Sequence, residues 1–122
     1  MSNKIVLLTG ASSGIGKEFA YCLSEIGFDI IIASRNISEL ENLKSSLIGN
    51  TSINIFPIQL DVSDHLSINN TVNYITKNFG SVDVLINNAG ITIENFILDM
   101  SEDDFDRIFT TNIKGPWLLA NS

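Results

Sequence analysis

Short apolar runs alternate with segments of helical periodicity along the whole chain. The runs are rich in β-branched residues and apolar on both faces, which is typical of strands buried in a parallel sheet. Between them, apolar residues recur every three or four positions, as on the buried face of a helix. The pattern predicts strands at Lys4–Thr9, Phe28–Ala33, Ile53–Leu60 and Val82–Ile86.

Helix-end signals separate these strands. We expect the first helix to end at Gly27, and the second to begin at a Ser38-x-x-Glu41 capping box and stop near Gly49. The predicted helices are Gly14–Ile26, Ser38–Ile48, a segment that ends at Gly80, and a region capped by Ser101-x-x-Asp104 that is interrupted near Gly115-Pro116. The apolar residues at helical spacing in the first helix are Ile15, Phe19, Leu23 and Ile26.

Strands and helices in this order predict an α/β fold, built by right-handed crossovers into a doubly wound, Rossmann-like parallel sheet. We expect the strand order 3-2-1-4, with the fourth strand on the outside. Pro57 lies in the third strand and removes one ladder donor, which suits an edge strand or a local irregularity.

Composition changes this picture little. The chain has 122 residues, of which 44% are hydrophobic and 17% charged, as is typical of one globular domain. No apolar run approaches the roughly 20 residues that span a bilayer, so we expect a soluble, cytoplasmic protein without a membrane partner. The net charge of −7 disfavours nucleic acid as a partner. The single cysteine, Cys22, is expected to be buried, and with the single histidine, His65, it predicts no metal site.

Candidate chemistry concentrates in the stretch Thr9-Gly10-Ala11-Ser12-Ser13-Gly14-Ile15-Gly16, between the first strand and the first helix. Such a junction leaves unpaired backbone N–H groups and the positive end of a helix dipole at one spot, where an anion can bind. The glycines permit a tight turn, close approach of a pyrophosphate and packing of helix on strand. The stretch is therefore a candidate phosphate-binding turn.

Two other motifs overlap this stretch and fit it less well. Gly10-x-Ser12-x-Gly14 matches a hydrolase nucleophile elbow, but His65 would have to be its base. The residues from Ala11 nearly match a P-loop, but Glu18 stands where a magnesium-binding hydroxyl is needed. An ordinary glycine-rich connection is the plain alternative.

Polar and glycine residues also follow the other three strands. They are Ser34-Arg35-Asn36, Asp61-Val62 and Asn87-Asn88-Ala89-Gly90. In an open parallel sheet a ligand binds outside the carboxyl ends of the strands, near the point where the strand order reverses. The four loops should therefore converge on one crevice, and a dinucleotide has the length to lie along that row.

With these loops placed, the chain resembles the short-chain dehydrogenase/reductase family from Lys4 onward. The family's T-G-x-x-x-G-x-G motif is Thr9 to Gly16, its Asp-Val is Asp61-Val62 and its N-N-A-G is Asn87 to Gly90. The resemblance implies an oxidoreductase that passes a hydride between a nicotinamide dinucleotide and a small carbonyl or alcohol substrate, similar to the 3-oxoacyl reductases.

The resemblance also implies a role for each motif position. Those implied for the cofactor are Gly10, Ser12, Ser13, Gly14, Ile15 and Gly16 at the pyrophosphate, Ser34, Arg35 and Asn36 at the adenosine ribose, Asp61 and Val62 at the adenine, and Asn87, Asn88, Ala89 and Gly90 at the nicotinamide ribose. Asn112 matches the helix asparagine of the family's catalytic set, which holds a water of the proton relay.

The residues after the second strand favour NADP over NAD. In NAD-preferring relatives an acidic residue there binds the ribose 2′-hydroxyl, whereas this chain has Ser34 followed by Arg35. An arginine can form two hydrogen bonds to a 2′-phosphate. We therefore expect NADP as the cofactor.

The family's catalytic Tyr-x-x-x-Lys has no match in these 122 residues, because Tyr21 precedes Glu25 and Tyr74 precedes Asn78. We expect residues 1–122 to be the cofactor-binding half of a reductase, a Rossmann domain truncated after about four strands and inactive on its own. The full-length form is expected to be a homo-oligomer. The alternative is a non-catalytic dinucleotide-binding or interaction module that uses the same crevice.

Overall fold

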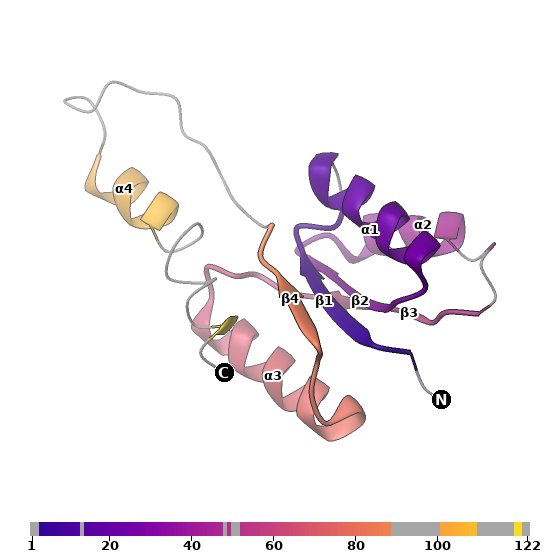
Figure 1. Ribbon diagram of the computed structural model, residues 1–122. Helices are drawn as coiled ribbons and strands as arrows, with labels where there is room; N and C mark the ends of the chain where they lie inside the picture. The colour runs from indigo at the N-terminus through magenta and orange to yellow at the C-terminus, as the bar shows by residue number, and fades with distance from the viewer. Residues whose placement is uncertain are drawn as a thin grey trace.

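A parallel sheet forms the centre of the molecule. The computed structural model describes residues 3–12, 14–47, 49, 52–88, 101–109 and 119–120, and within them lies a sheet of four strands in the order β3-β2-β1-β4 (Figure 1). The strands are β1 (Ile5–Thr9), β2 (Asp29–Ser34), β3 (Ile55–Gln59) and β4 (Val84–Ile86). In the register, Ile5 pairs with Asp29, Val6 with Val84, and Ile30 with Ile55. The predicted fold class and strand order are confirmed.

Helices cover both faces of this sheet. Helices α1 (Gly14–Ile26) and α2 (Ile37–Leu47) lie on one face, and α3 (His65–Phe79) lies on the other (Figure 1). Helix α4 (Glu102–Phe109) lies beyond the β4 side of the sheet in the same view. Among the described residues, no helix has both the length and the apolar character needed to cross a bilayer.

Alternating strand side chains build a separate apolar core on each face of the sheet. Toward α1 and α2 the core includes Val6, Leu8, Ala20, Leu23, Ile30, Ile32, Leu40, Leu43 and Leu47. Toward α3 it includes Leu7, Ile31, Ala33, Leu60, Val62, Ile68, Ile75 and Leu119. Removal of this surface from water, worth roughly 25 cal/mol per Å² of apolar area, holds the three layers together and fixes the strand ends in space.

Pro57 lies in an outer strand, as its position in the sequence predicts. The Ile30 amide donates to the Asn54 carbonyl (3.0 Å) and the Leu60 amide donates to the Ser34 carbonyl (2.8 Å). This alternation directs the backbone groups of every second β3 residue toward β2 and leaves the nitrogen of Pro57 on the outer side. The proline therefore removes a donor that the sheet does not use.

Hydrogen bonds explain two strand limits that differ from the prediction. Strand β4 starts at Val84 rather than Val82, because the Asp83 carboxylate accepts from the Ile5 amide (2.8 Å) in the place of a ladder bond. Strand β2 starts after Phe28, because the Phe28 amide donates to the Leu23 carbonyl (3.2 Å) and completes the end of α1.

Most of the predicted helix ends are confirmed, and one start is wrong. Gly27 and Gly80 follow α1 and α3 with φ angles of 106° and 81°, and the Asp104 amide donates to the Ser101 hydroxyl (3.0 Å). The predicted capping box at Ser38 is absent from the start of α2. Instead the Asn36 side chain accepts from the Glu39 amide (3.2 Å), so the helix begins earlier, where its buried leucines meet the sheet.

The buried face of α1 also differs from the predicted one. Ile15 and Ile26 are 71% exposed and Phe19 is 40% exposed. Cys22, on the same helix, is exposed as well, so its predicted burial is wrong. The buried residues are instead Gly16, Ala20, Leu23 and Ser24, which are mostly small. Small side chains let the helix approach the sheet closely. The large apolar residues on which the prediction relied lie mostly on the neighbouring, exposed face of the helix.

Candidate functional site

Hydrogen bonds link the loops that leave the carboxyl edge of the sheet. The Ala11 amide donates to the Ala33 carbonyl (3.3 Å), which ties the loop after β1 to the end of β2. The Leu60 amide donates to the Ser34 carbonyl (2.8 Å), which ties β2 to the loop after β3. The loops after β1, β2 and β3 therefore form one continuous edge.

The glycines of the turn after β1 meet two different requirements. Gly10 and Gly14 have φ angles of 64° and 59°, which favour glycine. At Gly16 the requirement is space, because a Cβ would overlap with the Gly10 carbonyl and lie 2.5 Å from Asn88 Nδ2. A Cβ at Gly14 would meet nothing within 4 Å, so a phosphate can approach the backbone at that point.

Asn88 fixes the loop after β4 against this turn. Its backbone amide donates to the Thr9 hydroxyl (3.0 Å) and its side-chain amide donates to the Gly10 carbonyl (3.1 Å). The Thr9 hydroxyl in turn donates to the Ile86 carbonyl (3.4 Å). Asn88 thus holds the glycine turn after β1 in place from the loop after the neighbouring strand.

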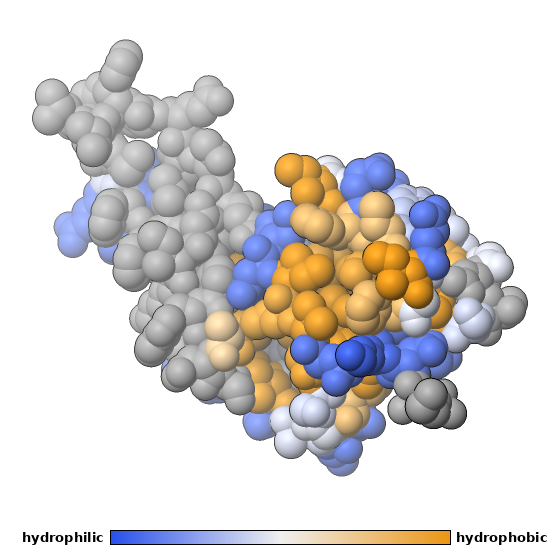
Figure 2. Space-filling view, viewed as in Figure 1, coloured by the Kyte–Doolittle hydropathy of each residue, from blue (hydrophilic) through white to orange (hydrophobic). Residues whose placement is uncertain are grey.

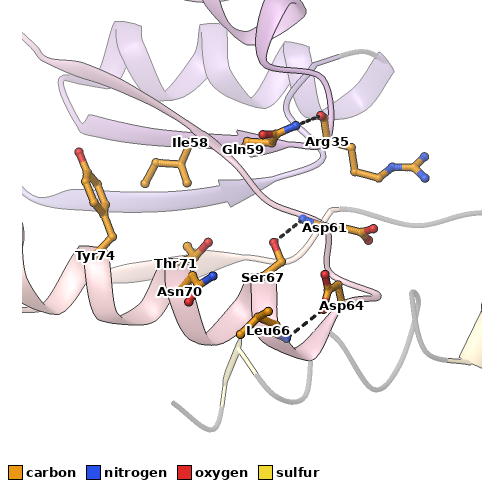
Figure 3. Close-up of a pocket in the computed structure, with 10 residues that line it drawn as sticks. All are labelled: Arg35, Ile58, Gln59, Asp61, Asp64, Leu66, Ser67, Asn70, Thr71 and Tyr74. Carbon is orange, nitrogen blue, oxygen red and sulfur yellow. Dashed lines mark hydrogen bonds between the residues drawn. The ribbon is translucent and has the colours of Figure 1, made fainter.

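Of the three predicted site residues at the end of β2, Ser34 and Asn36 shape the loop and Arg35 faces outward. The Ser34 hydroxyl accepts from the Asn36 amide (3.3 Å), and the Asn36 side chain caps α2. Arg35 is exposed, and its side chain extends out of the loop (Figure 3). No residue in the described part of the chain forms an ion pair with its guanidinium, so this cation is available to an anionic ligand.

The Asp61 carboxylate is oriented by the residues that follow it. Its Oδ1 accepts from the Ser63 amide (2.9 Å) and the Ser63 hydroxyl (2.6 Å), which forms an Asx turn. The Asp61 amide donates to the Ser67 hydroxyl (3.0 Å). The second carboxylate oxygen, Oδ2, has no hydrogen-bond partner among the described residues. The side chain of Val62 is buried in the core, which leaves only its backbone for a ligand.

A groove runs between β3 and α3 at this end of the row (Figure 3). Its volume is about 580 Å³, with Arg35, Gln59 and Asp61 at one end and Tyr74 at the other. The glycine turn does not line it. The groove therefore adjoins the row of loops at the Arg35–Asp61 end.

Most of the predicted site residues come together at this edge. They are Gly10, Ser12, Gly14, Ile15, Gly16, Ser34, Arg35, Asn36, Asp61, Val62, Asn87 and Asn88. The other four, Ser13, Ala89, Gly90 and Asn112, lie outside the described residues. The side chains that sequence reasoning missed are those that hold the loops: Thr9, Gln59, Ser63 and Ser67. Only Ser63 had a local signal, since Asp-x-Ser is an Asx-turn pattern.

The arrangement fits a dinucleotide. The glycine turn offers a helix N-terminus to a pyrophosphate, Arg35 offers a cation, and Asp61 offers a carboxylate oxygen to an amino group. These groups lie at neighbouring strand ends, where a dinucleotide binds in an open parallel sheet. Within the described part of the chain, no three His, Cys, Asp or Glu side chains lie close enough together to hold a metal ion.

Comparison with known sequences agrees with this reading. The family model described as short chain dehydrogenase matches residues 4–122. An NADP-dependent 3-hydroxy acid dehydrogenase of Schizosaccharomyces pombe is 37% identical over all of this chain and 48% of its own length. A 3-oxoacyl-[acyl-carrier-protein] reductase of Staphylococcus epidermidis is 36% identical over 93% of this chain and 46% of its own length. The chain thus spans about half the length of the curated relatives that it matches.

Solved structures give the same result at the level of the fold. An alcohol dehydrogenase from the archaeon Thermococcus sibiricus, complexed with 5-hydroxy-NADP, has a TM-score of 0.90 and 30% identity, with 97% of this chain and 50% of that chain covered. L-sorbose reductase from Gluconobacter frateurii, complexed with NADPH and L-sorbose, has a TM-score of 0.92 and 25% identity, with 98% and 46% covered. From the family match over nearly its whole length and the loops at the carboxyl edge of its sheet, this chain belongs to the short chain dehydrogenase family of oxidoreductases.

Proposed function

We propose that this protein is an NADP-dependent oxidoreductase of small carbonyl and alcohol substrates. The observation that carries the cofactor preference is the loop after β2, where the exposed Arg35 follows a buried Ser34 and no carboxylate stands beside them in the loop. A guanidinium binds a 2′-phosphate through two charged hydrogen bonds, whereas a carboxylate in this loop would favour the 2′-hydroxyl of NAD. In support, the S. pombe relative is NADP-dependent and the L-sorbose reductase structure contains NADPH.

In this proposal the cofactor lies along the carboxyl edge of the sheet. The backbone at Gly14 binds the pyrophosphate, Arg35 binds the 2′-phosphate, and Asp61 Oδ2 accepts from the adenine amino group. The bound nicotinamide supplies or accepts the hydride. Asn88 has a supporting role, because it keeps the phosphate-binding turn in the shape that the pyrophosphate requires.

The proposed substrate is a small carbonyl compound or the corresponding alcohol, of the 3-oxoacyl type. The two curated relatives are named for a 3-hydroxy acid and a 3-oxoacyl group. These groups differ by the two-electron step between an alcohol and a carbonyl. We further propose that Ser13, Ala89 and Gly90 complete the cofactor site and that Asn112 holds a water of the proton relay. A homo-oligomer in the cytoplasm is the proposed working form.

Titration of the purified protein with NADPH and with NADH, followed by nicotinamide fluorescence, tests the cofactor preference. Arg35→Ala should weaken NADPH binding by about 1.5–3 kcal/mol, the size of a hydrogen bond to a charged group, which is roughly 10- to 150-fold in Kd. Binding of NADH should be unchanged, because it has no 2′-phosphate.

The matched control is Lys77→Ala, which removes the same charge from the last turn of α3, at the opposite end of that helix from the site. It should leave the affinity for both dinucleotides unchanged. Equal or tighter binding of NADH by the unaltered protein would overturn the NADP assignment.

A further inference from the structure

The side chain of Gln59 makes a contact that spans two strands next to the proposed 2′-phosphate position. Gln59 is the last residue of β3 and pairs in register with Ser34, the last residue of β2. Its Nε2 donates to the Arg35 carbonyl at 3.1 Å, a contact between residues 24 apart in the chain (Figure 3). The exposed end of an outer strand thus reaches across to the arginine on which the cofactor preference rests.

The last residue of β2 and both residues of the loop that joins it to α2 are held by hydrogen bonds. The Ser34 carbonyl accepts from the Leu60 amide, and the Asn36 side chain accepts from the Glu39 amide. Between these two anchors the Arg35 carbonyl accepts a hydrogen bond from the side chain of Gln59. Because the Arg35 side chain has no ion-pair partner among the described residues, the direction in which it leaves the loop depends on the orientation of its own backbone.

Because the side chain of Gln59 is uncharged, it does not repel an anion at this position. Two carboxylates, Asp61 and Asp64, line the same groove. A third carboxylate at position 59 would repel a 2′-phosphate and could not donate to the Arg35 carbonyl. A glutamine supplies the donor without adding charge.

We infer that Gln59 is a positioning residue for 2′-phosphate recognition, acting through the Arg35 backbone rather than by contact with the ligand. The inference rests on the proposed function, since it concerns how the same site distinguishes NADP from NAD. An arginine held in place by its backbone loses less entropy when it binds a phosphate, so removal of the Gln59 contact should weaken phosphate binding without removal of any group that touches the ligand.

Two small ligands isolate the 2′-phosphate and require no turnover. Adenosine 2′,5′-bisphosphate carries the phosphate, and adenosine 5′-monophosphate lacks it. Calorimetric titration of the purified protein with each gives a ratio of dissociation constants that reports 2′-phosphate recognition alone. Gln59→Met keeps the length of the side chain and removes the hydrogen-bond donor. Gln59→Glu keeps the shape and replaces the donor with a negatively charged acceptor.

Gln59→Met should weaken binding of the bisphosphate by about 3- to 10-fold, the size of one neutral hydrogen bond, and leave the monophosphate unchanged. Gln59→Glu should weaken it further. In an Arg35→Ala background, Gln59→Met should have no additional effect on the bisphosphate, because its action passes through Arg35. A merely structural role would instead lower the affinity for both ligands in either background.

Asn70→Ala is the matched control, because Asn70 is an exposed amide of α3 that lines the same groove and forms no hydrogen bond to the loop among the described residues. It should leave the ratio unchanged. If the unaltered protein does not prefer the bisphosphate, the proposed function itself is wrong. If the unaltered protein prefers it and both Gln59 variants keep that preference, the positioning role of Gln59 is wrong. A Gln59→Ser variant, shorter and polar, decides the matter if the methionine variant does not fold.

Discussion

Two positions in the turn after β1 require glycine for different physical reasons. Gly14 needs glycine for its backbone angle, with open space around the position of a Cβ. Gly16 needs glycine because the helix lies against Gly10 and Asn88 with no room for a methyl group. The motif spacing predicts both glycines, but only the packing tells them apart, because the crowding at Gly16 comes from the Gly10 carbonyl and from Asn88, which follows a different strand.

Substitution by alanine should separate the two reasons. Gly16→Ala forces the start of α1 away from β1 and should destabilise the fold by roughly 1–3 kcal/mol while it abolishes dinucleotide binding. Gly14→Ala introduces no overlap and should destabilise by about 1–2 kcal/mol, the strain of a left-handed alanine. Urea unfolding measures the stability, and NADPH titration measures the binding. A Gly16→Ala protein that bound NADPH as tightly as the unaltered protein would show that the close contact is not needed for the site.

At the scale of helices and strands, the sequence predicts the existence of elements well and their limits less well. Four apolar runs and their crossovers led to the observed strand order, because burial on both faces leaves a clear pattern. Strand limits differed from the prediction where a hydrogen bond outside the regular ladder formed, as between the Asp83 carboxylate and the Ile5 amide. Asn36 displaced the expected cap at Ser38 because both residue types are good caps, and the buried face of the helix decides between them.

For the candidate site, the sequence likewise predicts some residues and not others. The motif residues that the structure describes lie at or just after the carboxyl ends of the strands, because the apolar pattern locates those strands. Long-range supports such as Gln59 and Thr9 could not be predicted, since nothing in their local sequence indicates a partner on another strand. The buried face of α1 was predicted wrongly because it consists mostly of small residues, which a search for hydrophobic periodicity does not detect.

Helix caps offer a quantitative test at this scale. The Asp64 carboxylate accepts from the Leu66 amide (3.0 Å) and caps α3, which should make Asp64→Ala destabilising by about 1 kcal/mol. Asn36→Ala should have a similar effect at α2. Ser38→Ala is the matched control and should change stability by less than about 0.5 kcal/mol, as an exposed helical position without a cap role. Urea unfolding of the three variants measures these differences, and a larger loss at Ser38 than at Asn36 would contradict the observed cap.

At the scale of the whole molecule, an apolar surface lies beside α1. Ile15, Phe19 and Ile26 follow one another at helical spacing and are 40% exposed or more, and Val84 of the outer strand β4 is 39% exposed. Figure 2 shows hydrophobic side chains gathered on the face of the molecule that carries α1. Surfaces of this kind on small proteins promote association, and an outer strand adds unpaired backbone groups.

We therefore expect the 122-residue polypeptide to self-associate at micromolar concentration. Ile26→Lys should reduce association by placing a charge within the apolar surface. Ser45→Lys adds the same charge at an exposed position of α2, away from that surface, and should have little effect. Sedimentation velocity measures the distribution of species. A clean monomer with a sharp thermal transition would show that the apolar surface does not drive association.

We propose above all that the loops at the carboxyl edge of the sheet form a site for NADP, with Arg35 at the 2′-phosphate. The most direct measurement is a crystal structure of the protein with NADPH. We expect the pyrophosphate at the Gly14 backbone, the 2′-phosphate within hydrogen-bond distance of the Arg35 guanidinium, and the adenine amino group at Asp61. A dinucleotide bound elsewhere, or one at this edge whose 2′-phosphate is turned away from Arg35, would contradict this proposal.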